Sequence, residues 1–310
     1  MSNRVHWIEI KIECDGEIAE ALADVLGRFV SNGVVIESIT RFNPKTQENE
    51  PIGRLSVSGY LAVNEDLEVK RQKLEEALWH LSQIQPIAKP EYKPIKDENW
   101  MEAWKAHYHP IPVGENLLIM PAWNQPDGDD EHTIIRINPA MAFGTGTHPT
   151  TQLCLRLLEK HMQKGIYVID VGCGSGILSI AALKLGAAHV LAVDTDKQAV
   201  ASTLDNAGIN DLTPGLLESG QGSVKEILSG EFAIQNAPLV MVNILATVII
   251  KLFDDGLAHL VQDGGVLLLS GILAPQEEEV RQTAKKAGLI QVDRLTEGDW
   301  VSLALIKQER

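Results

Sequence analysis

The feature that most constrains this chain is a strand, a glycine turn and a helix that follow one another in residues 167–186. Tyr167–Val171 is short, apolar and rich in β-branched residues, which indicates a buried parallel strand. Three glycines follow at alternate positions: Gly172, Gly174 and Gly176. Apolar residues then recur at helical spacing until Gly186, a residue type that commonly ends a helix. Glycine allows a sharp turn and a close ligand, and the helix N-terminus offers free N–H groups. This run therefore predicts a ligand site.

The residues around this turn separate two classes of cofactor. Dinucleotide folds use G-x-G-x-x-G, whose third glycine lets the helix pack closely on the strand, and Ile177 stands at that position here. Asp170 precedes the first glycine, and the next apolar strand ends in Asp194, about twenty residues further on. A carboxylate there can accept both hydroxyls of an adenosine ribose. A strand-end Asp, a G-x-G-x-G turn and a second strand-end acid are typical of the S-adenosylmethionine site of Rossmann-like methyltransferases. A plain strand-to-helix turn does not explain why both strands end in Asp.

Composition limits the classes of partner and the cellular compartment that we expect for this chain. A length of 310 residues is enough for one large or two medium domains. The net charge of −15 argues against direct nucleic-acid binding, which needs a basic face, and would suit a basic protein partner. The three cysteines form no C-x-x-C pair, so we expect neither a disulfide framework nor a metal site. The most apolar window, residues 238–253, is too short to span a bilayer. Because no secretory leader starts the chain, we expect a cytoplasmic protein without a membrane partner. We also expect it to be a monomer.

The first 92 residues have the pattern of a small α+β domain. Alternating apolar and polar residues predict strands at 5–13, 34–42, 55–63 and 88–92. Helical stripes of apolar residues predict helices at 17–29 and 65–83. The resulting β-α-β-β-α-β order is that of the ferredoxin-like fold. Since the scattered titratable residues form no catalytic constellation, we expect residues 1–92 to bind a substrate.

A connector, residues 93–112, is expected between this domain and a Rossmann-like domain at 113–310. Prolines interrupt the connector, and Asp97 can cap a short helix within it that carries Trp100 and Trp104 on one face. Two tryptophans at that spacing favour packing over substrate stacking. The second domain opens with a pair of predicted strands, 114–123 and 133–137, around an acidic loop.

A Gly/Thr-rich loop, residues 138–151, leads into a helix predicted at 151–162. Its glycines and hydroxyls can approach a ligand, so the loop could lie across the methionine end of the cofactor. Alternatively, Thr150 or Thr151 simply caps the helix, and both roles are compatible. His148 is a candidate general base, but a structural role is favoured for a histidine in a loop before proline.

Asn243 follows a strand predicted at 239–242, the fourth of the parallel sheet. Ligands in such sheets bind outside the carboxyl ends of the strands, where the amide carbonyl could accept a hydrogen bond from an incoming amine. An Asn that merely ends a strand is the alternative. Further along, strands at 290–295 and 300–306 are expected to form a hairpin.

Several of these segments resemble one known family. AFGTGTHPTT at 142–151, VIDVGCGSGILSIAALKLGA at 168–187, VNILA at 242–246 and LSGIL at 269–273 are similar to the signatures of the ribosomal protein L11 methyltransferases, the PrmA family. The linker ENWMEAWKAHYHPIPVG also looks like that of the family. The resemblance covers nearly the whole chain.

The resemblance implies a ferredoxin-like domain that docks ribosomal protein L11, a mobile linker and a C-terminal methyltransferase domain. The substrate amines would be lysine ε-amino groups and the N-terminal α-amino group of L11. The residues implied to hold S-adenosylmethionine are Thr151, Gly172, Asp194 and Asn243, with Gly174 and Phe143 in the same motifs. Asn243 would also act in catalysis by orienting the amine.

The chain departs from the family pattern at residues 138–141, where Asn-Pro-Ala-Met replaces the usual Asp-Pro-Gly-Leu, and at 195–197. The N-terminal domain matches the family by its pattern of strands and helices and not by a sequence motif. The alternatives are therefore a methyltransferase that acts on another protein, RNA or a small molecule, and a non-catalytic ribosome-associated binding protein. A nicotinamide oxidoreductase comes last, because Ile177 breaks the dinucleotide fingerprint.

Overall fold

The structure is a computed structural model that describes residues 6–30, 33–43, 48–63, 67–82, 85–95, 109–125, 132–138, 146–213 and 215–308. By their internal contacts the described residues separate into two compact units, divided between His109 and Pro110. The helix expected after Asp97 lies outside the described residues.

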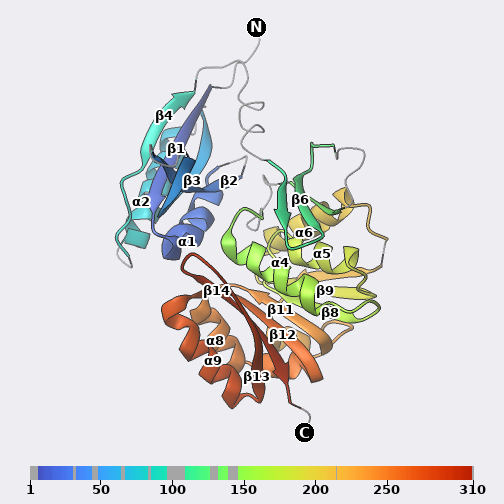
Figure 1. The fold of residues 1–310 in the computed structure, drawn as a ribbon. Helices are drawn as coiled ribbons and strands as arrows, with labels where there is room; N and C mark the ends of the chain where they lie inside the picture. Colours follow the sequence, from blue (N-terminus) through green and yellow to red (C-terminus); the bar gives the residue numbers. More distant parts are fainter. Residues whose placement is uncertain are drawn as a thin grey trace. The chain divides into compact units, whose positions relative to one another are not determined.

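The N-terminal unit is a four-stranded antiparallel sheet with two helices (Figure 1). Its elements are β1 His6–Cys14, α1 Gly16–Gly27, β2 Val34–Asn43, β3 Glu48–Val63, α2 Leu67–Ser82 and β4 Glu91–Ile95. The strand order β2-β3-β1-β4 confirms the predicted ferredoxin-like fold. Both helices cover one face of the sheet, because alternate residues of β1, such as Ile10 and Ile12, pack with Leu22 of α1 and Leu74 of α2 in one buried cluster.

Two strands of this unit differ in length from the prediction. β3 begins at Glu48 instead of residue 55, because the polar residues before it pair with β2 down to Asn43 opposite Glu48. β4 runs from Glu91 to Ile95 instead of 88–92, because Trp7 to Lys11 of β1 supply its partners there.

The C-terminal unit contains a seven-stranded sheet in the order β10-β9-β8-β11-β12-β14-β13. The strands are β8 Tyr167–Val171, β9 His189–Asp194, β10 Leu217–Gln221, β11 Ala237–Asn243, β12 Val261–Leu273, β13 Leu289–Glu297 and β14 Trp300–Lys307. β8 to β12 run parallel, whereas β14 is antiparallel to both of its neighbours, as the predicted hairpin requires. The strand order changes direction between β8 and β11, and α/β sheets bind ligands at such a point.

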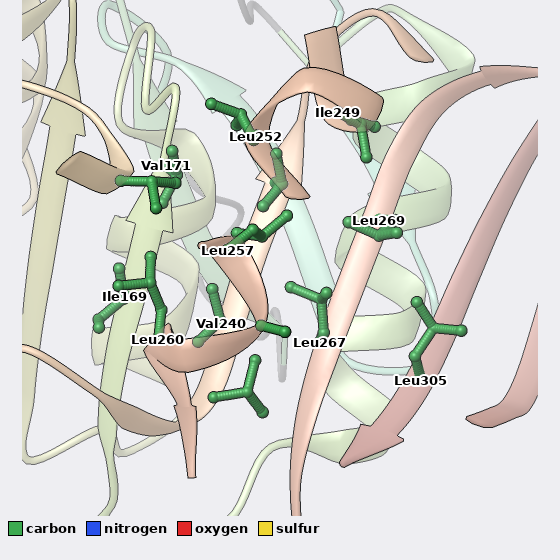
Figure 2. Close-up of a cluster of buried hydrophobic side chains, with 14 of the residues drawn as sticks. Ile169, Val171, Val240, Ile249, Leu252, Leu257, Leu260, Leu267, Leu269 and Leu305 are labelled. Carbon is green, nitrogen blue, oxygen red and sulfur yellow. The ribbon is translucent and has the colours of Figure 1, made fainter. Parts of the chain in front are cut away.

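Helices cover both faces of this sheet (Figure 1). One layer holds α4 Pro149–His161, α5 Ile177–Lys184 and α6 Lys197–Ile209, and the other holds α7 Val224–Leu228, α8 Ala246–Asp254, the short 3₁₀ turn Leu257–Leu260 and α9 Glu277–Lys286. Side chains of β8 alternate between the two cores: Val168 packs toward α4 and α5, whereas Ile169 and Val171 pack toward α8. Figure 2 shows this second core, in which Ile249 and Leu252 of α8 meet the sheet. Burial on both faces explains the nearly continuous apolar strands of the sequence.

A small sheet completes the C-terminal unit. β5 Ile111–Val113 is antiparallel to β6 Leu117–Pro121, and β6 is parallel to β7 Thr133–Ile137. Its apolar residues share a core with α4 and α5. The sequence predicted the strands near β6 and β7 but neither β5 nor α7, which have too few residues for a periodic signal. In the part of the chain that the structure describes, no helix has the length and apolar character to cross a membrane.

Candidate active site

The glycine turn joins β8 to α5 through three residues with left-handed backbones. Gly172, Gly174 and Gly176 have φ angles of 79°, 54° and 78°, which side chains with a Cβ rarely adopt. The N–H of Gly172 donates to the Val193 carbonyl over 2.8 Å, so the turn lies against the end of β9. A Cβ on Gly172 would also lie 2.7 Å from Cγ2 of Ile244, just after β11. The turn is therefore in close contact with the ends of two strands.

Asp194 ends β9 beside this turn. Its Oδ2 accepts a hydrogen bond from the Gly174 N–H at 3.0 Å, and its Oδ1 accepts one from the Asp196 N–H at 2.9 Å. These bonds fix the carboxylate against the glycine turn. Each carboxylate oxygen can accept a second hydrogen bond, so Asp194 keeps the capacity to accept hydroxyl donors from a ligand.

Asn243 and Thr151 meet at the end of β11. The Asn243 Nδ2 donates to Oγ1 of Thr151 across a long 3.4 Å, and Thr151 is fully buried in the first turn of α4. Oδ1 of Asn243 is also buried and accepts no hydrogen bond from the described residues. A buried carbonyl without a donor is costly in a folded protein. This atom is therefore an open acceptor for a ligand N–H.

Asp170, on β8, adds a second acid to this edge of the sheet. It is fully buried, and burial raises the pKa of its carboxyl to about 7. Its Oδ2 accepts a hydrogen bond from the Ser179 hydroxyl at 2.6 Å, while Oδ1 has no partner among the described residues. The charge of Asp194 raises the pKa of Asp170 further. Two acids here suit a cationic ligand and disfavour an anionic pyrophosphate.

His148 has a structural role in this arrangement. Its Nδ1 accepts from the Thr150 N–H at 3.3 Å and lies 2.8 Å from the Thr150 hydroxyl, so His148 caps α4. The alternative of a cap by Thr150 or Thr151 was wrong, because His148 is the N-cap residue. The ring packs edge-on against Trp300, with 5.0 Å between ring centroids. Burial lowers the pKa of His148 to about 4, so the ring is neutral at neutral pH.

Other side chains complete the turn. Thr203 of α6 donates through Oγ1 to the Gly174 carbonyl at 3.1 Å. Sequence reasoning missed Thr203; the available signal was a polar residue on the helix face that should be buried. Ile177, at the third position of the dinucleotide fingerprint, is only 3% exposed and belongs to the core shared by α4 and α5.

The structure thus brings five of the predicted site residues to one edge of the sheet. Gly172 and Gly174 follow β8, Asp194 and Asn243 end β9 and β11, and Thr151 contacts Asn243 from α4. Phe143 lies outside the described residues. The roles of these residues toward a cofactor stay predictions.

The strand order, the G-x-G-x-G turn after β8 and the acid at the end of β9 define the Rossmann-like fold of S-adenosylmethionine-dependent methyltransferases. Within this class, the chain belongs to the ribosomal protein L11 methyltransferase (PrmA) family, whose sequence profile matches residues 6–308.

Individual relatives agree with this membership. The chain is 38% identical to the ribosomal protein L11 methyltransferase of Chloroflexus aurantiacus, with 96% of this chain and 97% of the relative aligned. It is 36% identical to that of Herpetosiphon aurantiacus, over 96% and 98% of the two chains. A crystal structure of the ribosomal protein L11 methylase from Lactobacillus delbrueckii subsp. bulgaricus aligns with a TM-score of 0.57 at 33% identity, covering 65% of this chain and 100% of that one.

Proposed function

We propose that this protein is an S-adenosylmethionine-dependent N-methyltransferase of ribosomal protein L11, acting on lysine ε-amino groups and on the N-terminal α-amino group. The observation that carries the proposal is the family match over residues 6–308, which includes both units of the chain. The alignments with the two L11 methyltransferases named above cover nearly the whole length of those relatives.

The residues at the sheet edge fit S-adenosylmethionine. Gly172 and Gly174 would let the cofactor approach the backbone, and Asp194 has acceptor capacity left for the ribose hydroxyls. The carboxylate of Asp194 would balance the positive charge of the cofactor, and a nearby cation would favour the ionised form of Asp170. When bound, the cofactor supplies an electrophilic methyl group on a sulfonium ion.

The chain must present a neutral amine to that methyl group in line with the carbon–sulfur bond. Oδ1 of Asn243, buried and without a donor, would accept one amine N–H and so direct the nitrogen lone pair. The Thr151 hydroxyl would hold the amide in the orientation that leaves this oxygen open. Because the departing thioether is neutral, no general acid is required.

The amine must also lose a proton first. With a pKa near ~10.4, fewer than about one lysine in a thousand is neutral at neutral pH. Entry into a site that excludes water lowers that pKa, because burial disfavours the charged form. His148 is not the base in this proposal, since its Nδ1 is engaged with Thr150 and capping α4. Solvent would take the proton.

The ferredoxin-like unit is proposed to dock L11. The net charge of −15 suits a basic protein and would repel RNA. The proposed domains are the substrate-binding domain at 1–92, the linker at 93–112 and the methyltransferase domain at 113–310. Presenting several amines to one site requires a substrate domain that can move relative to the catalytic domain.

The test is a label-transfer assay. The protein and methyl-labelled S-adenosylmethionine are incubated separately with purified L11, with ribosomal RNA and with free lysine. We expect label only in L11, and its loss in the Asp194→Ala variant. Label in RNA or in free lysine instead would contradict the L11 assignment, and a bound cofactor without transfer to any substrate would favour a non-catalytic binding protein.

A further inference from the structure

The buried side of α6 is polar where an apolar side is expected. A helix that covers a sheet normally buries an apolar stripe, but the buried residues of α6 are Ala199, Ser202, Thr203 and Asn206, and its C-cap Asn210 is only 5% exposed. A buried carboxamide destabilises the fold unless both ends are hydrogen-bonded. The two asparagines therefore need partners, and those partners indicate what the helix does.

Asn206 connects two segments that are far apart in the sequence. It is fully buried; its Nδ2 donates to the Ser175 carbonyl at 2.9 Å, and its Oδ1 accepts from the Asn138 N–H at 2.9 Å. Ser175 lies in the glycine turn, and Asn138 directly follows β7. Because one partner is a carbonyl and the other an N–H, only one orientation of the amide satisfies both.

Asn210 bonds β7 and, through Nδ2 at 2.8 Å, the Asn206 backbone carbonyl, but none of its hydrogen bonds among the described residues is to the glycine turn. Its Oδ1 accepts from the Arg136 N–H at 2.8 Å, and its Nδ2 donates to the Arg136 carbonyl at 2.6 Å. These two bonds imitate those of a neighbouring strand. Asn210 is thus a matched control for Asn206: it is the same residue type, one turn later, buried, and bonded to the same strand.

Side chains from β9 and α6 hold the glycine turn by hydrogen bonds to two successive residues, Gly174 and Ser175. Asp194 accepts from the Gly174 N–H, Thr203 donates to the Gly174 carbonyl, and Asn206 donates to the Ser175 carbonyl. Of these three side chains, Asn206 is the one that also bonds the backbone just after β7, at the Asn138 N–H. A shift of the turn on ligand binding would therefore be transmitted to the Asn138 backbone through the Asn206 carboxamide.

We infer that Asn206 is a positioning residue that couples the glycine turn to the end of β7 at Asn138, so that cofactor binding at the turn stabilises both. The cofactor part of this inference rests on the proposed function; the mechanical link between the two segments does not. Removing the carboxamide deletes one hydrogen bond to the buried Ser175 carbonyl and one to the Asn138 N–H. The turn and the end of β7 should then move independently.

The first measurement compares Asn206→Ala and Asn210→Ala with the wild type by calorimetric titration of S-adenosylmethionine. We expect the dissociation constant to rise about tenfold for Asn206→Ala, the equivalent of one lost buried hydrogen bond. Asn210→Ala should stay within about twofold, because its bonds do not reach the turn. Thermal unfolding confirms that both variants are folded.

The second measurement is amide hydrogen exchange without cofactor, read on peptides that cover residues 133–138 and 172–177. Asn206→Ala should exchange faster in both peptides, and Asn210→Ala only in 133–138. Adding cofactor should slow exchange of 133–138 in the wild type but not in Asn206→Ala. This transfer of protection is a readout that mere destabilisation does not produce.

A conservative variant covers the case in which Asn206→Ala does not fold. Asn206→Asp keeps an acceptor for the Asn138 N–H but loses the donor to the Ser175 carbonyl. We expect slow exchange at 133–138 to persist without cofactor, cofactor affinity to fall, and the transfer of protection to disappear.

Some outcomes overturn the inference. Unchanged affinity and unchanged exchange in a folded Asn206 variant would do so, as would equal losses in the Asn206 and Asn210 variants. A wild type that fails to bind S-adenosylmethionine would instead refute the proposed function, and exchange without cofactor would still decide whether Asn206 links the two segments.

Discussion

Asp170→Asn should change how the stability of the C-terminal unit depends on pH. Asp170 is fully buried, and burial raises the pKa of its carboxyl from 3.8 to about 7. A raised pKa means that the folded protein favours the protonated form. The contribution of Asp170 to stability is therefore fully present below pH 3.8 and is lost as the pH rises through about 7.

The magnitude follows from these two pKa values. Moving a carboxyl from 3.8 to about 7 corresponds to at most about 4 kcal/mol of unfolding free energy once the pH exceeds both values. Of this, about 2–3 kcal/mol is lost between pH 5 and pH 8. Asn cannot ionise but keeps an acceptor for the Ser179 hydroxyl, which now donates to Oδ2. Any cost of placing an NH₂ group where Oδ1 lacks a partner, about 1–3 kcal/mol, is the same at every pH.

The assay is urea unfolding of the wild type and Asp170→Asn at pH 5 and pH 8. Since two units need not unfold together, the transition is read by pulsed hydrogen exchange on peptides of β8 and β11. Other titrating groups are common to both proteins, so the difference between them isolates Asp170. We expect the wild type to lose about 2–3 kcal/mol relative to the variant from pH 5 to pH 8. A difference that stays constant within about 0.5 kcal/mol would refute the buried, pKa-raised carboxyl.

Two further substitutions test the site, and a third, with its control, tests the backbone of β12. Asn243→Ala should lower kcat at least about tenfold and by a larger factor than it raises the cofactor dissociation constant; equal losses in both would contradict its role in orienting the amine. Asp194→Ala should raise the cofactor dissociation constant about tenfold or more, and unchanged affinity would remove the ribose contact. Gly271→Ala should destabilise the fold by about 2 kcal/mol or more, because its Cβ would lie 2.1 Å from the Ile244 carbonyl oxygen at a φ of 82°. Gly288→Ala, with φ 85° and nothing within 4 Å, should cost clearly less in the same thermal unfolding assay.

The sequence predicted the parts of the site that local signals encode. β8 matches its predicted bounds because an apolar run between glycines admits few other structures. Asp194 was placed by its position at a strand end about twenty residues after the glycine turn, and Asn243 by the rule that ligands lie outside the carboxyl ends of parallel strands. A change from apolar to polar residues at the end of a strand is visible without tertiary contacts.

What the sequence did not reveal depends on packing between distant segments. Thr203 and Asn206 were not singled out from the sequence, and only the structure places them against the glycine turn. The first residues of β3 are polar and form a strand because β2 supplies partners. His148 caps α4 because the ring is held between Thr150 and Trp300, which are far apart in the sequence.

The most direct test of the central claim is the intact mass of purified ribosomal protein L11 after incubation with this protein and S-adenosylmethionine, with Asn243→Ala as the matched variant. We expect L11 to gain mass in whole methyl increments, peptide mapping to place them on lysine side chains and on the N-terminal amine, and Asn243→Ala to slow every increment. An unchanged L11 mass in the presence of a demonstrably bound cofactor would contradict the assignment of L11 as the substrate.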